Sequence, residues 1–190
     1  MKISSSLKLL KIALDQKGYF TAKQAIECGL ASNNHHYYVK KREWIREIRG
    51  IYRMSVIKIE TNQEYWFWYL WSKDREDAPQ GVFSHETALA LYELSDINPR
   101  KIHMTIPKSF RKGTKIPKVL YLHKGILHNK DIKIIDGFKV TTPLKTLIDL
   151  MEEKRISPEF IEQAVKEAMK RGLIIRADLK ENPDLARYAL

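Results

Sequence analysis

The spacing of apolar residues changes within the first 60 residues of the chain. Leu7, Leu10 and Leu14 recur at helical spacing, which predicts a helix over residues 4–17. Residues 19–20 predict a short strand, and residues 44–48 and 51–54 alternate apolar and polar side chains around Gly50. Two alternating runs joined at a glycine predict a β-hairpin, with which the short strand would pair.

Residues 21–42 predict two short helices joined by a tight turn. Thr21 is expected to cap the first helix, and Gln24 three residues later completes a capping box. Gly29 is expected to end this helix and Ser32 to cap the second one. Two helices joined by a glycine-containing turn form the helix-turn-helix signature, whose second helix enters the DNA major groove. With the hairpin as a wing, the pattern predicts a winged helix-turn-helix domain.

The second helix carries side chains suited to reading DNA. Val39 is its only aliphatic residue, and placing Val39 on the core side turns Asn34, Tyr37 and Lys41 outward. Asparagine amides pair with adenine edges, and lysine or arginine binds guanine or phosphate. The residues expected to contact DNA, including those of the hairpin, are Lys23, Asn33, Asn34, Tyr37, Tyr38, Lys40, Lys41, Arg42, Arg46, Arg49 and Arg53.

An ordinary helical hairpin with a solvated polar face is the alternative interpretation of residues 21–42. His35 and His36 fall nearer to the Val39 side of the second helix, so both are expected to be packed and hydrogen-bonded rather than to contact bases.

An aromatic helix and a linker are predicted over residues 60–81. Thr61 and Glu64 form a second capping box, and the helix that follows to about Lys73 has aromatic side chains on every side. Such a helix is either buried all round or half of an interface, and burial in a core is the main interpretation. Its acidic flanks disfavour a base-stacking platform.

Residues 82–190 predict a mixed α/β domain with a small sheet and C-terminal helices, so the chain as a whole is expected to be α+β. Strands are predicted at 82–83, 102–106, 119–122, 132–135 and 138–140. Helices are predicted at 85–94, 142–151, 158–172, 177–181 and 183–188, with Glu86, Thr87 and Glu93 on the polar side of the first. The expected domains are therefore 1–59, a connecting segment 60–81, and 82–190.

The net charge of +11 is distributed unevenly, which bears on the partner. Residues 1–59 carry a net +8 and residues 97–145 a net +10, whereas 60–96 carry −6 and 146–190 carry −1. Two basic blocks indicate contact with polyanions, although solvated lysines would explain the second block equally well. One cysteine excludes an intramolecular disulfide, and the sequence has neither a signal-peptide pattern nor a membrane-length apolar run, so a cytoplasmic protein is expected.

The order of motifs after residue 80 resembles the AbiEi antitoxin family of bacterial type IV toxin–antitoxin and phage-defence systems. The resemblance lies in GVFSHETALALYELSD (81–96), IHMTIPKSFRK (102–112), VLYLHKG (119–125) and IIDGFKVTTPLKTLIDL (134–150), and the winged module resembles that family's DNA-binding domain. It implies an autorepressor that binds inverted repeats of double-stranded DNA in its own promoter, as a dimer on DNA. It also implies an antitoxin that counters a nucleotidyltransferase-like toxin without a stable complex.

Carried onto this chain, the resemblance places the antitoxin activity in residues 82–150. The polar positions expected to form the antitoxin surface are Lys108, Arg111, Lys112, Lys115, Thr141, Thr142 and Lys145. Thr141 and Thr142 precede a helix, where free N–H groups favour anions, but helix capping explains both residues equally well.

The sequence does not predict an enzyme, a metal site or a cofactor. His85-Glu86 lacks the second histidine of a helical zinc motif, and His123 and His128 have no cysteine or carboxylate at ligand spacing. Asp136 is explained by the Asp-Gly turn. The alternatives left open are an RNA- or nucleotide-binding modulator, or a cryptic nuclease, that uses the basic region 97–145.

Overall fold

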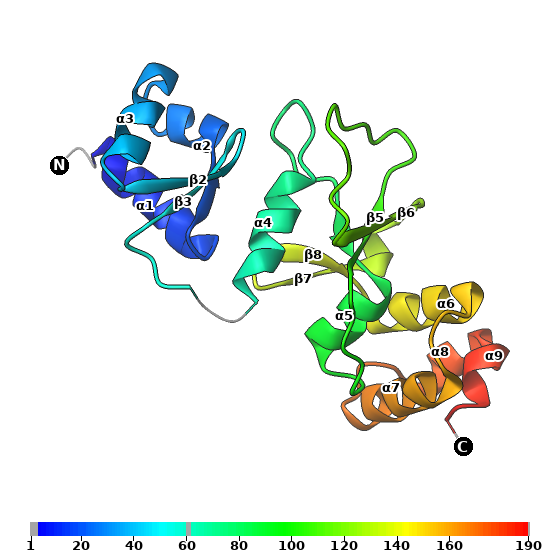
Figure 1. The fold of residues 1–190 in the computed structure, drawn as a ribbon. Coiled ribbons are helices and arrows are strands. Elements are labelled where there is room, and N and C mark those ends of the chain that lie inside the picture. Colours follow the sequence, from blue (N-terminus) through cyan, green and yellow to red (C-terminus); the bar gives the residue numbers. More distant parts are fainter. Residues whose placement is uncertain (1–3, 60–61, 190) are drawn as a thin grey trace. The chain divides into compact units, whose positions relative to one another are not determined.

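The computed structural model describes residues 4–59 and 62–189 of the chain, which forms two compact units, residues 1–80 and 81–190 (Figure 1). Each unit combines helices with its own sheet, so the predicted α+β class is confirmed. The aromatic helix, predicted as part of a separate connecting segment, is grouped with the first unit. No helix in the described ranges combines the length and the apolar character required to cross a membrane.

The first unit has the element order of a winged helix-turn-helix domain. Its elements are α1 (Ser5–Asp15), β1 (Tyr19–Thr21), α2 (Ala22–Glu27), the 3₁₀ turn η1 (Ser32–Asn34), α3 (His35–Lys40), β2 (Trp44–Ile48), β3 (Ile51–Met54) and α4 (Gln63–Trp71). The three strands are antiparallel in the order β1-β3-β2, so the predicted short strand does pair with the hairpin. At the hairpin tip Gly50 has a φ of 81°, which glycine adopts without steric cost.

Aromatic side chains dominate the core of the first unit. Phe20 is fully buried and meets Trp44 edge-on at a centroid distance of 4.8 Å, a favoured aromatic geometry. Tyr52 also stacks on Phe20, at 5.8 Å, and lies 5.6 Å from Trp44, so the three rings contact one another. Leu9 of α1 is also fully buried in this cluster. The core therefore joins α1, β1 and the hairpin.

Helix α4 is buried as the sequence predicts. Trp66, Tyr69, Leu70 and Trp71 are each at most 7 % exposed, and the helix packs against β1 and β3. Thr61, expected to cap this helix, lies outside the described residues.

The loop that follows α4 is tied to the helix-turn-helix. Thr21 hydrogen-bonds through its hydroxyl to Asp77, and Lys23 Nζ donates to the Glu76 carbonyl oxygen at 2.7 Å. Lys73 bonds both to Asp77 and to the carbonyl oxygen of Gly50 at the hairpin tip. We call residues 73–77 the anchor loop, because these contacts connect it to α2 and to the hairpin.

The second unit is a five-stranded mixed sheet with helices. Its elements are β4 (Val82–Phe83), α5 (His85–Tyr92), β5 (Ile102–Ile106), β6 (Leu120–Lys124), the 3₁₀ turn η2 (Asn129–Asp131), β7 (Ile132–Ile135), β8 (Phe138–Thr141), α6 (Pro143–Glu153), α7 (Pro158–Lys170), α8 (Arg176–Glu181) and α9 (Pro183–Ala186). The strand order is β6-β5-β4-β8-β7, with β5–β6 and β4–β8 parallel. Helix α5 packs against β5 and α6, and α6 packs against α7.

Two local predictions about this unit are wrong. Glu86 and Thr87 were expected on a polar face of α5, but both are buried, because α5 lies between the sheet and α6. Thr141 was expected on the antitoxin surface, but it is fully buried and its hydroxyl lies 2.7 Å from that of Thr146.

Candidate nucleic-acid interface and histidine cluster

The turn between α2 and α3 is built from the residues that the sequence singles out. The Thr21 hydroxyl accepts from the Gln24 amide at 3.1 Å, and the Gln24 side chain accepts from the Thr21 amide at 2.9 Å. This reciprocal pair is the predicted capping box. Gly29 follows with a φ of 93°, and a Cβ there would lie 2.8 Å from the Ser5 hydroxyl. The turn therefore requires glycine both for its backbone and for the close approach of α1.

His35 fixes the position of α3. Its imidazole is 4 % exposed and its Nε2 lies 3.0 Å from the Leu30 carbonyl oxygen, which makes that nitrogen the donor. The ring packs against Trp44 and Tyr52 at centroid distances of 5.2 and 5.7 Å. The packed, hydrogen-bonded role predicted for His35 is confirmed, whereas His36 is exposed and the same prediction for it is wrong.

Two other details around α3 differ from the prediction. Ser32 does not cap the helix, because residues 32–34 form a 3₁₀ turn whose N-cap is Ala31 and which has no side-chain capping bond. Tyr38, expected to flank the outward face, stacks on Trp44 at 4.6 Å and packs against the core. A helix as short as α3 needs such tertiary contacts, since it cannot be stable alone.

The remaining polar side chains of this segment form an outward face. The exposed residues are Asn33, Asn34, Tyr37, Lys40, Lys41 and Arg42. Tyr37 is 49 % exposed, and the Lys41 ammonium lies 4.5 Å from its ring centroid. The face thus combines amides that can pair with base edges and cations that can bind phosphate.

The hairpin contributes further cations beside this face. Arg46 and Arg49 are exposed, and neither forms an ion pair within residues 4–59 and 62–189. Arg53 instead donates to Glu47 at 2.8 Å across the hairpin, and Lys23 binds the anchor loop. Both residues therefore have contacts within the first unit in addition to the DNA contact predicted for them.

Residues 8–55 match the family model described as a transcriptional regulator, AbiEi antitoxin. The predicted resemblance to AbiEi antitoxins is therefore confirmed over residues 8–55. The match covers the winged helix-turn-helix and ends before α4. No curated protein matches the chain. Among solved structures, the crystal structure of the RV2827C protein from Mycobacterium tuberculosis has a TM-score of 0.56 at 12 % identity, over 100 % of this chain and 76 % of that one. At such an identity the likeness concerns the fold alone.

The residues predicted as an antitoxin surface divide into two groups. Lys108, Arg111, Lys112 and Lys115 lie in the loop between β5 and β6, where Arg111 bends back to donate to the Lys108 carbonyl oxygen at 2.9 Å. The others belong to the start of α6: Thr142 caps the helix, and Lys145 pairs with Asp149 at 2.6 Å. Helix structure accounts for the second group, so the loop holds the accessible cations of the set.

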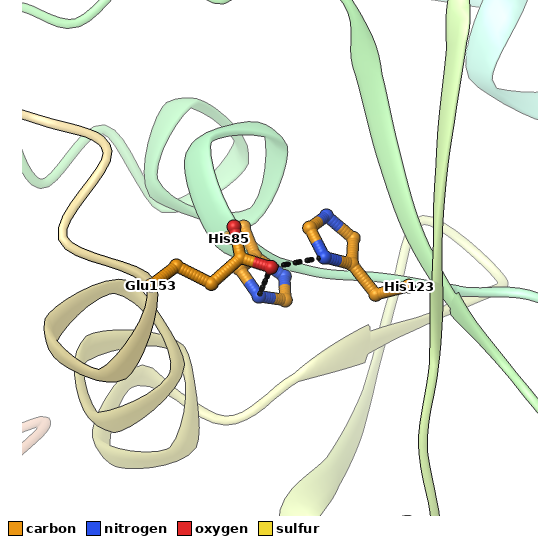
Figure 2. Close-up of side chains that lie close together, drawn as sticks. All are labelled: His85, His123 and Glu153. Carbon is orange, nitrogen blue, oxygen red and sulfur yellow. Dashed lines mark hydrogen bonds and ion pairs between the residues drawn. The ribbon is translucent and has the colours of Figure 1, made fainter.

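A histidine cluster in the second unit has no counterpart in the sequence predictions. His85 begins α5, His103 lies on β5, His123 lies on β6 and Glu153 ends α6. Figure 2 shows the Glu153 carboxylate facing both imidazoles, with Oε1 lying 2.7 Å from His123 Nδ1 and 3.6 Å from His85 Nε2. The His85 and His123 rings stack at 3.5 Å. Sequence spacing could not predict this arrangement, because the residues meet only when β5 and β6 pair and α5 packs on α6.

Burial sets the protonation of this cluster. It lowers the pKa of His85 to about 3, reinforced by the neighbouring His123, so this imidazole is uncharged at neutral pH. Burial also lowers the pKa of His123, although Glu153 opposes the shift. For Glu86, burial alone would raise the pKa, but the contact with His103 lowers it and the net direction is down.

Proposed function

We propose that this protein is a DNA-binding autorepressor and antitoxin of a bacterial type IV toxin–antitoxin system. The observation that carries the proposal is the exposed amide- and lysine-rich face of η1 and α3, in a unit that matches AbiEi transcriptional regulators. In this proposal α3 lies in the major groove and the hairpin contacts the flanking phosphates. Two copies bind an inverted repeat, with half-site centres separated by whole helical turns of about 10 bp each.

The outward residues divide into base-reading and phosphate-binding groups. Asn34 and Tyr37 occupy the start and middle of the exposed face, where amide and hydroxyl groups reach base edges. Lys41 and Arg49 flank this face on α3's C-terminal side and at the hairpin tip, and bind phosphate. The opposite side of α3 packs on Trp44 through His35 and Tyr38.

The experiment is a fluorescence-anisotropy titration of the full chain with DNA from upstream of its own gene, at several salt concentrations. Lys41→Gln and Arg49→Gln should each weaken binding to all sequences and reduce the salt slope by about 1. Asn34→Ala should leave the slope unchanged and reduce discrimination against a scrambled operator by roughly 5- to 100-fold, since a bidentate base contact supplies about 1–3 kcal/mol.

Lys11→Gln provides the charge-matched control, because Lys11 is exposed on α1 and outside the proposed interface. It should leave the salt slope unchanged. Equal slopes for Lys11→Gln and Lys41→Gln, or equal affinity for operator and scrambled DNA in the unsubstituted chain, would contradict the proposed interface.

The antitoxin activity is proposed for residues 81–190, on the resemblance of the motifs in 81–150 to AbiEi antitoxins. The toxin is expected to be nucleotidyltransferase-like and to form no stable complex with this chain. Cells expressing the toxin should be rescued by residues 81–190 alone. They should not be rescued by residues 1–80, which contain the proposed DNA interface. Replacing Lys108 and Lys115 together by Gln tests the β5–β6 loop, and full rescue by that variant would exclude these cations from the activity.

A further inference from the structure

The side chains of His85, His123 and Glu153 converge inside the second unit, although they are far apart in the sequence. One donor atom from each lies within 4.8 Å of the other two. They come from the start of α5, from β6 and from the end of α6, so three separate elements have to pack correctly to assemble them (Figure 2). A surface cluster of charges would not require such packing.

The distances fit a small tetrahedral ion. Zinc binds imidazole nitrogen and carboxylate oxygen at about 2.0–2.2 Å, so two ligand atoms of a tetrahedral site are separated by about 3.3 Å. The distance from Glu153 Oε1 is 3.6 Å to His85 Nε2 and 2.7 Å to His123 Nδ1. His85 Nε2 lies within 4.8 Å of His123 Nδ1, and the two rings stack face to face at 3.5 Å. Because an imidazole lone pair lies in the ring plane, binding of one ion by both nitrogens requires at least one ring to rotate about its χ2 angle.

The second ring nitrogen of each histidine is already held by a hydrogen-bonding partner, as in metal-binding histidines generally. His85 Nδ1 lies 2.9 Å from the Ser84 hydroxyl, which also accepts a hydrogen bond from Thr105. His123 Nε2 lies 2.9 Å from His103 Nδ1. These contacts orient the rings so that His85 Nε2 and His123 Nδ1 face Glu153.

One carboxylate oxygen of the cluster supports a cation independently of this geometry. Glu153 Oε2 is buried without a hydrogen-bond partner, and its ion pair with Arg155 Nη1 is long, at 3.6 Å. The other buried carboxylate, Glu86, already has a partner, because its Oε2 lies 3.0 Å from His103 Nδ1. Buried acceptors without full partners are costly, and a bound cation would offset that cost.

We propose that His85, His123 and Glu153 bind a divalent transition-metal ion, with zinc as the best match. Two imidazoles and one carboxylate suit zinc, whereas magnesium and calcium prefer all-oxygen sites. Three protein ligands leave a fourth position for water or an exogenous ligand. Glu153, whose side chain is 28 % exposed against 6 % for His85 and 9 % for His123, lies on the solvent side where the ion enters.

The test uses the full chain after removal of metals by a chelator. Cobalt(II) serves as the spectroscopic probe and zinc as the competitor, with the stoichiometry read from the visible absorption of four-coordinate cobalt. The expected result is saturation at one ion per chain, displacement by zinc, and a rise of several degrees in the melting temperature of the second unit when zinc is present.

Glu153→Gln and His123→Gln should each weaken cobalt binding by about 100-fold or more and remove the zinc-dependent rise in melting temperature. His128→Gln is the matched control, because His128 is an exposed histidine of the same unit outside the cluster. Circular dichroism of each variant establishes that it is folded, and Glu153→Gln is expected to fold because its side chain is partly exposed. Absence of saturable cobalt binding, or binding that Glu153→Gln and His128→Gln affect equally, would overturn the site.

The DNA titration of the same metal-free chain separates this inference from the proposed function. The metal ligands all lie in the second unit, whereas the proposed DNA contacts lie in the first. Operator binding without metal binding overturns only the metal site, and metal binding without operator binding overturns only the repressor.

Discussion

His35 offers a sharp test of how the first unit holds α3, since its imidazole both donates to the Leu30 carbonyl and packs on Trp44. His35→Leu replaces the imidazole with an apolar side chain of similar size and removes the N–H that donates to the Leu30 carbonyl oxygen. A net hydrogen bond contributes about 1 kcal/mol, and leaving a buried acceptor without its donor raises the loss to about 1–3 kcal/mol. With a urea dependence of about 1 kcal/mol per molar for a small domain, the unfolding midpoint should fall by about 1–3 M.

Tryptophan fluorescence is the appropriate readout, because all four tryptophans of the chain lie within residues 1–80 and therefore report on the first unit only. His36→Leu makes the same substitution at the exposed neighbouring position and should change the free energy of unfolding by less than about 0.5 kcal/mol. If His35→Leu and His36→Leu unfold at the same urea concentration, His35 does not fix α3 and the reasoning is refuted.

Three further predictions concern the turn, the anchor loop and the histidine cluster. Thr21→Ala removes the cap of α2 and the bond to Asp77, and should cost about 1–2 kcal/mol in urea unfolding; an unchanged midpoint would contradict the capping box. Gly29→Ala should cost at least about 1 kcal/mol, because a left-handed alanine is strained and its Cβ would meet Ser5, and a gain in stability would be the opposite result. Without metal, the second unit should lose stability as the pH falls below 6.5, because unfolded His85 binds a proton that native His85, with a pKa of about 3, does not. The loss from this residue is about 2 kcal/mol at pH 5, and His85→Gln should flatten the pH dependence of thermal unfolding by that amount.

The sequence predicts the first unit well because its signals are local. The capping box joins residues three apart, Gly29 marks a backbone that only glycine adopts easily, and the hairpin follows from alternation around Gly50. The predictions that are wrong concern residues whose conformation depends on tertiary packing. Residues 32–34 form a 3₁₀ turn instead of the helix cap expected from Ser32. Tyr38 packs toward the core because its ring stacks on Trp44.

The histidine cluster could not be predicted because it depends on topology. Glu86 looks like a solvated helix residue until α5 is placed between the sheet and α6. His103 and His123 lie on strands whose parallel pairing no short motif indicates. One signal was present in the sequence: His103 stands within the apolar strand 102–106, where a polar side chain needs a buried partner.

The anchor loop determines how short an N-terminal fragment can be and still fold. A fragment that stops at residue 59 would lack Glu76 and Asp77, which bind Lys23 and Thr21, and would expose the strand surfaces that α4 covers. The shortest N-terminal piece expected to fold and bind operator DNA therefore extends to Gln80, well beyond the end of the wing at Met54.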